Sequence, residues 1–183
     1  MIIKNNDPYT EASFDFKNRF LRFLWDMVYI TLFLPSPRSL HSWRVLLLRV
    51  FGAKIGKHCH IYPKVKIWAP WNIELGNYIG IADSVKLYSM DKIFIHDYSV
   101  ISDGSYLCCG SHDYNSKNFQ LITKPITIKK KTWICSEVFI HPGITISEGG
   151  VVGARSVVSK NLDHEYKVYA GNPCKLIKDR EIL

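Results

Sequence analysis

The sequence has no Cys-x-x-Cys pair, no long uninterrupted apolar run and no two histidines five residues apart. Its five cysteines are odd in number and include an adjacent pair, so we expect neither a disulfide framework nor a zinc knuckle. The first eleven residues lack the basic-then-apolar order of a secretory signal. The richest apolar stretch, 20–34, contains two charged residues and is short for a membrane span. The cysteine pattern and the missing signal favour a reducing, cytoplasmic compartment. The apolar stretch 20–34 is expected to be a helix that is buried or lies at an interface.

The composition is that of one folded domain with a basic surplus. The chain has 183 residues, of which 47% are apolar and 22% charged, so it is neither disordered nor an ordinary multi-span membrane protein. Lysine and arginine number 24 against 16 acidic residues, which gives a net charge of +8. Such a surplus suggests an anionic partner, which could be nucleic acid, a lipid surface or a phosphorylated small molecule.

Aliphatic residues recur every six positions through most of the chain. The step of six begins at Ile55, is interrupted three times, and ends at Val158. A helix would repeat every three to four residues and a long strand every two, so the period predicts very short strands separated by corners, three to each turn of a triangular coil. We therefore expect five coils, at 55–67, 75–87, 95–107, 128–140 and 146–158. All fifteen repeating positions are Ile, Leu or Val: Ile55, Ile61, Ile67, Leu75, Ile81, Leu87, Ile95, Ile101, Leu107, Ile128, Ile134, Ile140, Ile146, Val152 and Val158.

The segments on either side of the coils differ from them. Two helices, 14–34 and 38–51, are expected before the coils, and a short basic helix, 174–182, after them. We divide the chain into a helical cap (1–52), a coiled region (53–160) with a loop at 108–125, and a C-terminal tail with its helix (161–183). The apolar faces of the first two helices are expected to cover the open first coil: Phe16, Phe20, Phe23, Leu24, Met27, Trp43, Leu46, Leu47 and Val50.

Several short motifs accompany the repeat. Aliphatic-Gly pairs stand at 55–56, 75–76, 79–80 and 152–153, and longer motifs include Pro70-Trp71-Asn72, Gly110-Ser111-His112-Asp113-Tyr114, Trp133-Ile134-Cys135, 151–158 and Gly171-Asn172-Pro173. With these motifs the chain resembles the hexapeptide-repeat acyltransferases, within them the exopolysaccharide (colanic-acid-type) O-acetyltransferases related to galactoside acetyltransferase. The resemblance implies a mainly β fold, a left-handed parallel β-helix, and transfer of acetyl from acetyl-CoA to a sugar hydroxyl. It also implies a homotrimer with active sites between subunits.

The loop at 108–125 is the first candidate for chemistry. Leu107 and Ile128 are 21 residues apart where six would suffice, and a loop of this length in a compact fold is usually functional. His112 lies in it, and a neutral imidazole can take the proton of an attacking hydroxyl. In the resembled family this loop histidine is the general base, whereas the plain alternative is a histidine that hydrogen-bonds its own loop. We expect that His112→Ala folds and loses at least about a hundredfold in kcat.

By resemblance, the acetyl donor lies along the last coils. The amide of Ser136 is the candidate oxyanion donor, and Cys135 is not expected to act as a nucleophile because the family transfers acetyl directly. The donor-binding residues implied are Trp133, Cys135, Ser136, Ala154, Ser159, Lys160, Lys175 and Lys178. Much of the informative basic surplus falls beside this predicted groove, at Lys160, Lys167, Lys175, Lys178 and Arg180.

The acceptor side is less defined. Galactoside acetyltransferases use an Asn and an Asp before the loop, and the matching positions here are Ala82 and Met90, which departs from a galactoside acceptor. Asp103, Asp113 and Asn115 are candidates for contact with the sugar or for orienting the catalytic histidine.

Two other functions remain as alternatives. A γ-carbonic-anhydrase-like enzyme would use the same fold with zinc, but the His-x4-His ligand pair of that class is absent, so we expect no metal. A non-catalytic scaffold on the inner face of the membrane would use the aromatic segment 14–34. Nucleic acid is not expected as a partner, because no reader motif accompanies the charge.

Overall fold

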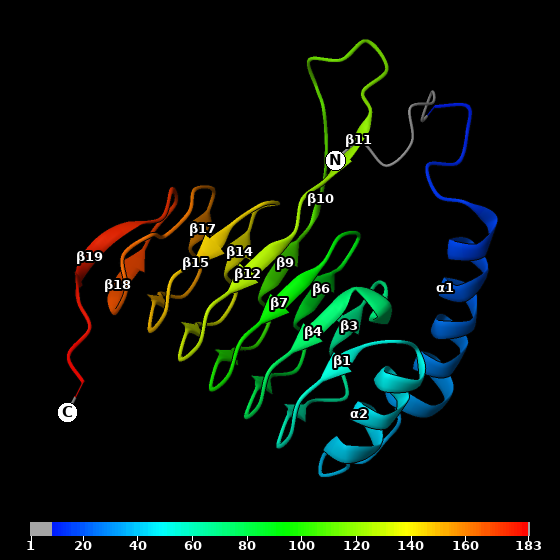
Figure 1. Ribbon diagram of the computed structural model, residues 1–183, viewed down its shortest axis with the longest axis horizontal. Helices are drawn as coiled ribbons and strands as arrows, with labels where there is room; N and C mark the ends of the chain where they lie inside the picture. Colours follow the sequence, from blue (N-terminus) through cyan, green and yellow to red (C-terminus); the bar gives the residue numbers. More distant parts are fainter. Residues whose placement is uncertain (1–8, 183) are drawn as a thin grey trace.

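The chain folds into a parallel β-solenoid with helices at one end (Figure 1). The computed structural model describes residues 9–182. Three parallel sheets run along the coil, and each coil contributes one short strand to each sheet. The first sheet contains β1 (Lys54–Ile55), β4 (Ile73–Leu75), β7 (Ile93–Ile95), β12 (Ile126–Ile128) and β15 (Thr145–Ile146). The second contains β2 (His60–Ile61), β5 (Gly80–Ile81), β8 (Val100–Ile101), β13 (Trp133–Ile134), β16 (Val151–Val152) and β18 (Lys167–Ala170). The third contains β3 (Lys66–Ile67), β6 (Lys86–Tyr88), β9 (Tyr106–Cys108), β14 (Phe139–Ile140) and β17 (Val157–Val158).

The core is a stack of aliphatic side chains inside the coil. All fifteen repeating positions are buried, and equivalent positions pair in register, as Ile61 does with Ile81 and Ile140 with Val158. Each strand is too short to be stable alone, and its backbone groups are satisfied by the coils above and below it. The predicted parallel β-helix is therefore confirmed. Beyond the five expected coils, β18 and the Ile146–Leu162 bridge begin a sixth.

The first coil is covered by α1 (Phe16–Val28), a π-helical turn η1 (Tyr29–Phe33) and α2 (His41–Val50). The two expected helices are confirmed, but the face assigned to the coil was mostly wrong. The covering side chains include Trp25, Phe33 and Leu48, all buried, and the indole N–H of Trp25 donates to the carbonyl of Ile67 at 2.7 Å. The apolar stripe of α1 faces away from the coil, and the helix turns toward the coil a mixed face on which Trp25 is the buried residue and satisfies this carbonyl. Of the residues expected to cover the coil, only Leu47 is buried, whereas these are exposed: Phe16, Phe20, Phe23, Leu24, Met27, Trp43, Leu46 and Val50.

The expected helix at 174–182 was also wrong. The chain turns back after β18 and forms β19 (Lys175–Asp179), which pairs antiparallel with β18. An isolated nine-residue helix is marginal, whereas this strand gains hydrogen-bond partners along the open edge of the second sheet. The lysines at 175 and 178 therefore lie on a strand.

The structural elements fall near the expected divisions, with α2 ending at Val50, β1 beginning at Lys54 and β17 ending at Val158. Residues 1–8 and 183 of the expected first and last segments lie outside the described residues. Along residues 9–182 we find no helix with both the length and the apolar character needed to cross a bilayer.

Candidate active site

The long loop is a hairpin that stands away from the coil (Figure 1). Its strands, β10 (Gly110–His112) and β11 (Leu121–Thr123), pair antiparallel, with His112 opposite Leu121. The hairpin leaves the coil at the corner after β9, which we call the third corner because it follows the third sheet. Gly110 sits tightly there, since a Cβ at this position would lie 2.5 Å from the sulfur of Met90. The base of the hairpin is thus held against the coil while its tip projects.

The imidazole of His112 is oriented by the loop. Its Nδ1 lies 2.8 Å from the carbonyl oxygen of Phe119, and the two rings stack with centroids 4.5 Å apart. Because a carbonyl only accepts hydrogen bonds, Nδ1 carries the proton, and Nε2 keeps its lone pair in the neutral ring. The residue is exposed, and Nε2 makes no hydrogen bond to any of residues 9–182. This is the arrangement that a general base requires.

Phe119 was not among the residues expected in the site. It has a φ of 45°, a left-handed conformation that is uncommon for a bulky residue. This conformation is part of the turn that brings its carbonyl to His112. No motif marks such a contact in the sequence, because the contribution comes from the backbone.

Asp113 and Asn115 shape the tip of the same hairpin. One carboxylate oxygen of Asp113 accepts the backbone N–H of Asn115 at 3.1 Å, and the Asp113 carbonyl accepts the Ser116 hydroxyl at 3.0 Å. The Asp113 N–H donates to the carbonyl of Gln120 across the hairpin. Asp113 and Asn115 therefore lie on the same hairpin as His112. The Asp113 carboxylate is hydrogen-bonded within the tip of the hairpin, and the imidazole is oriented by the Phe119 carbonyl instead.

A second group of expected site residues lies at the corner between the second and third sheets, the second corner. Asp103, Ser136 and Ala154 occupy the same position in three successive coils. The N–H of Glu137 donates to the carbonyl of Asp103, and the N–H of Arg155 to that of Ser136. All three stacked residues are exposed. The structure thus brings these three residues together in one column.

The Ser136 amide is suited to bind an oxyanion. Among residues 9–182 no acceptor lies within hydrogen-bonding distance of its N–H, although the neighbouring amides at 135 and 137 are bonded within the coil. An exposed N–H held by a rigid corner can donate to a charge that develops only during reaction, at little cost in reorganisation.

Trp133 and Cys135 precede this amide and have structural partners. The indole N–H of Trp133 donates to the Ser102 hydroxyl at 2.9 Å, and its ring lies partly exposed on the outer face of the second sheet. The carbonyl of Cys135 accepts the Ser105 hydroxyl at 2.8 Å. Burial raises the pKa of the Cys135 thiol, which disfavours the thiolate that a nucleophile needs.

The remaining donor-side residues lie at the far end of the coil. Ser159 and Lys160 follow β17 at the third corner, the corner from which the hairpin leaves two coils earlier. Lys175 and Lys178 lie on β19, opposite Ala170 and Val168. Within the described part of the chain none of these three lysines forms an ion pair, and all three are exposed.

The expected site is therefore divided between two corners of the triangular coil. His112, Ser159 and Lys160 are at the third corner, whereas Ser136 and Ala154 are at the second. One protomer does not bring the histidine and the Ser136 amide to the same corner. Over residues 9–182 there is also no group of three or more His, Cys, Asp or Glu side chains arranged to hold a metal ion.

Comparison with known proteins gives consistent matches. The chain is 49% identical over 157 residues to the colanic acid biosynthesis acetyltransferase WcaF of Escherichia coli K12, covering 86% of each protein. It is 30% identical over 139 residues to the galactoside O-acetyltransferase of E. coli, covering 74% of this chain and 68% of that protein. No family model matches the chain.

Solved structures share the fold. A hexapeptide-repeat acetyltransferase of Vibrio cholerae, complexed with acetyl coenzyme A, superposes with a TM-score of 0.84 at 22% identity, covering 93% of each chain. A galactoside acetyltransferase in complex with coenzyme A superposes with a TM-score of 0.81 at 24% identity, covering 99% of this chain and 92% of that one.

Proposed function

Because the chain belongs to the family of the colanic acid biosynthesis acetyltransferases, we propose that it transfers acetyl from acetyl-CoA to a sugar hydroxyl during exopolysaccharide assembly. The observation that supports this most is the state of His112 on its projecting hairpin. Its Nδ1 is bonded to the Phe119 carbonyl at 2.8 Å, which leaves Nε2 free to accept a proton.

The reaction uses that nitrogen twice. Nε2 of His112 accepts the proton of the sugar hydroxyl while the hydroxyl oxygen attacks the thioester carbonyl carbon. The oxyanion of the tetrahedral intermediate accepts a hydrogen bond from the Ser136 N–H. The C–S bond then breaks, the imidazolium returns its proton to the leaving thiolate, and the products are the acetylated sugar and CoA.

The two corners meet when the protein is a homotrimer. His112, Ser159 and Lys160 from the third corner of one protomer then face Ser136 and Ala154 from the second corner of its neighbour. The small side chain at 154 leaves room for the pantetheine arm beside the backbone, with Trp133 and Cys135 on the same wall. The exposed lysines at 160, 175 and 178 hold the phosphates, so CoA binding should weaken as salt rises. The sugar acceptor contacts Asp113 and Asn115 on the hairpin that carries His112. It contacts Asp103 in the Ser136 column of the neighbouring protomer.

Mixed trimers test this arrangement. His112→Ala removes the base and Ala154→Trp blocks the donor wall, so each variant alone should be inactive. When the two are co-expressed, an interface that combines an intact His112 with an intact Ala154 regains activity. Recovery in purified mixed trimers supports a shared site, and its absence in confirmed mixed trimers refutes it. Sedimentation equilibrium of the wild type gives the oligomeric state.

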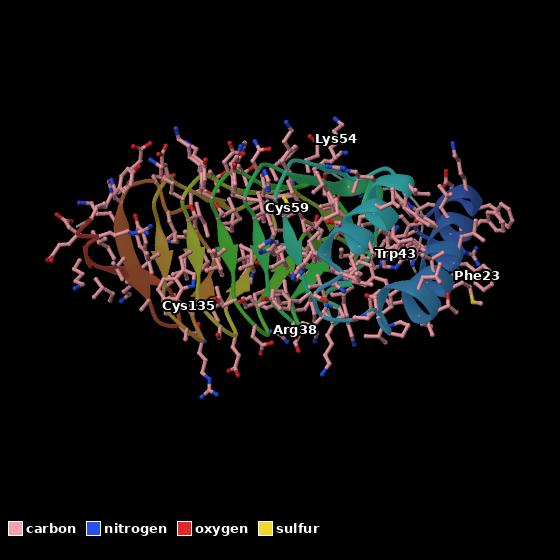
Figure 2. The ribbon with its side chains drawn as sticks, turned by 90° about the horizontal axis from the view of Figure 1, so that it is seen from below. Phe23, Arg38, Trp43, Lys54, Cys59 and Cys135 are labelled. Carbon is pink, nitrogen blue, oxygen red and sulfur yellow. The ribbon has the colours of Figure 1, made fainter. Side chains whose placement is uncertain are left out.

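The exposed face of α1 supports a location at the inner face of the membrane. Phe16, Phe20, Phe23 and Met27 of α1, followed by Ile30 of η1, form an apolar stripe on the side opposite the coil, and each is about half exposed or more. Figure 2 shows Phe23 at the outer end of the molecule, on the helix that covers the first coil. In a trimer with parallel coils all three stripes lie at the same end, so their contacts with a lipid surface add.

Vesicle flotation tests the membrane contact. Wild-type protein should float with vesicles that contain phosphatidylglycerol, and Phe23→Glu should reduce the bound fraction several-fold. Ile177→Glu is the matched control, because residues 23 and 177 are 59% and 60% exposed and lie at opposite ends of the coil. Equal flotation of the two variants contradicts the contact.

The function itself is tested by acetyl-CoA consumption with released thiol as the signal. Purified protein is assayed against nucleotide sugars and lipid-linked glycans, and acetylated product is identified by mass spectrometry. Acceptor-dependent thiol release supports the proposal. Failure of acetyl-CoA to bind the folded trimer refutes it and favours a non-catalytic scaffold.

A further inference from the structure

A groove of about 250 Å³ lies between α1 and the outer face of the third sheet. Its sheet side is formed by two outward-facing rows of residues from the first three coils, and its helix side by the end of α1 and the start of η1. Two types of side chain predominate, partly buried aromatic rings and lysines. The lining residues are Asp26, Tyr29, Lys66, Ile67, Trp68, Lys86, Leu87, Tyr88 and Tyr106.

The aromatic rings form a continuous wall. Trp68 and Tyr88 lie edge to face with centroids 6.0 Å apart, and Tyr88 and Tyr106 do so at the same distance. All three rings are only partly buried. Trp68 also contacts the Phe14 ring, with centroids 4.8 Å apart, and Tyr106 contacts the Phe139 ring at 5.1 Å. The exposed parts of the three rings offer an apolar surface against which a pyranose ring can pack while its hydroxyls stay available for hydrogen bonds.

The charge of the groove is mostly positive. Lys66 and Lys86 are directly opposite each other in neighbouring parallel strands, where like charges repel. Neither forms an ion pair within the described residues, and the ammonium of Lys86 instead lies 5.5 Å from the centroid of the Tyr106 ring. A third cation, the guanidinium of Arg22, lies 4.4 Å from the centroid of the Trp68 ring. Asp26 is the one carboxylate among the lining residues, and it pairs with neither lysine.

The groove adjoins the base of the catalytic hairpin. Tyr106 begins β9, the strand from which the hairpin leaves the coil, and Gly110 lies against Tyr88. A Cβ at residue 110 would be 3.2 Å from a ring carbon of Tyr88. His112 follows two residues later, so a ligand in the groove lies beside the hairpin that bears the base.

We propose that this groove is the acceptor subsite and that it selects a sugar carrying an anionic group. The sugar ring packs on the wall of Trp68, Tyr88 and Tyr106, and the anion binds between Lys66 and Lys86, where it relieves their repulsion. A carboxylate on the sugar and a phosphate at its anomeric carbon have this chemistry in common. The assignment rests on the proposed acetyl transfer and replaces the acceptor residues of galactoside enzymes, whose positions are Ala82 and Met90 here.

Three probes of equal ring size test the selectivity: methyl glucoside, methyl glucuronoside and glucose 1-phosphate. Calorimetry on the wild-type protein should show at least one anionic probe binding about tenfold more tightly than the neutral one, since two exposed lysines each contribute modestly. Comparison of the two anionic arms shows whether carboxylate or phosphate is preferred. Equal affinity for all three probes overturns the proposal.

Substitutions show which side chains cause the preference for anionic probes. Lys66→Gln with Lys86→Gln should reduce the anionic preference to within about twofold, whereas Lys57→Gln with Lys64→Gln, which removes two exposed lysines outside the groove, should preserve it. Trp68→Ala should weaken all three probes in parallel. A preference that survives the Lys66 and Lys86 substitutions overturns the assignment.

Acetyl-CoA binding to the same preparations distinguishes a wrong acceptor assignment from a wrong function. If acetyl-CoA binds and the anionic preference is absent, the acceptor assignment fails alone. If acetyl-CoA does not bind the folded wild-type protein, the proposed function fails with it.

Discussion

Replacing His112 separates a catalytic role from a structural one. Removing a general base typically lowers the rate by about a hundredfold to ten-thousandfold, so we expect His112→Ala to lose at least about a hundredfold in kcat, equivalent to about 2.7 kcal/mol in activation free energy. The loss should appear in kcat, because the imidazole acts in the transition state, whereas the KM for acetyl-CoA should change little.

The same substitution should scarcely affect folding. The imidazole is exposed and makes one hydrogen bond, to the Phe119 carbonyl, together with the stack on the Phe119 ring. Both contacts lie within the hairpin, and neither involves the aliphatic core of the coil. The urea midpoint of His112→Ala should therefore be within about 0.5 kcal/mol of the wild type.

His112→Asn distinguishes the two roles directly. The asparagine amide can donate to the Phe119 carbonyl as Nδ1–H does, but it has no nitrogen that accepts a proton. If the histidine only supports its loop, this variant should restore most of the activity lost in His112→Ala. We expect it to be as inactive as the alanine variant in the released-thiol assay. Near wild-type turnover of either variant would refute the assignment of His112 as the base.

Two further predictions concern the cap and the thiol. Trp25→Ala should destabilise the protein by about 3–5 kcal/mol in urea denaturation, because a buried indole bonded to the Ile67 carbonyl is lost, whereas Phe23→Ala on the exposed face should stay within about 0.5 kcal/mol. Equal effects would mean that the covering face is assigned wrongly. Cys135→Ser should keep kcat within about twofold, because burial raises the thiol pKa and so leaves little thiolate near pH 7. A hundredfold loss would instead indicate an acetyl-cysteine intermediate.

The coil could be predicted from the sequence because its constraint is local and repeated. Each inward position accepts only an aliphatic residue of limited size, and the same requirement returns in every coil, so the pattern accumulates over fifteen positions. The loop at 108–125 was predictable for the same reason, as an interruption of that pattern, although its two paired strands were not. The extra partial coil was not, because Leu162 and β18 continue the stack after the period of six has ended.

The helical cap shows where such a pattern becomes ambiguous. Periodicity detects the apolar face of α1 that contains Phe16, Phe20 and Phe23, but this face is exposed and the buried residue, Trp25, lies on the other side of the helix. The buried face is determined by a contact distant in the chain, between the Trp25 indole and the Ile67 carbonyl. Hydropathy contains no information about which carbonyl is left without a partner at the end of a coil. The same limitation explains β19, whose strand conformation depends on the open edge of β18.

Within the candidate site, sequence reasoning named the side chains and the Ser136 amide but missed the carbonyl of Phe119. His112 was accessible through its motif and its loop, whereas the carbonyl of Phe119 that orients it depends on a left-handed residue seven positions later. The lysines of the acceptor groove could have been predicted from the sequence. Lys66 and Lys86 each stand one residue before an inward-facing position, as Tyr106 does in the third coil. Reading that outward column beside the inward one would have revealed them.

The division of the site between two corners follows from the geometry of the coil. A triangular solenoid keeps residues of one corner in a column and separates them from the next corner by a whole sheet, so the two groups of site residues lie at different edges of one protomer. The exposed Ser136 amide and the free nitrogen of His112 lie at such different corners. Each is a rigid group whose hydrogen-bonding capacity the chain itself leaves unused. Assembly would then bring base and oxyanion donor together, and the activity of this protein should fall with the fraction of trimer as the protein is diluted.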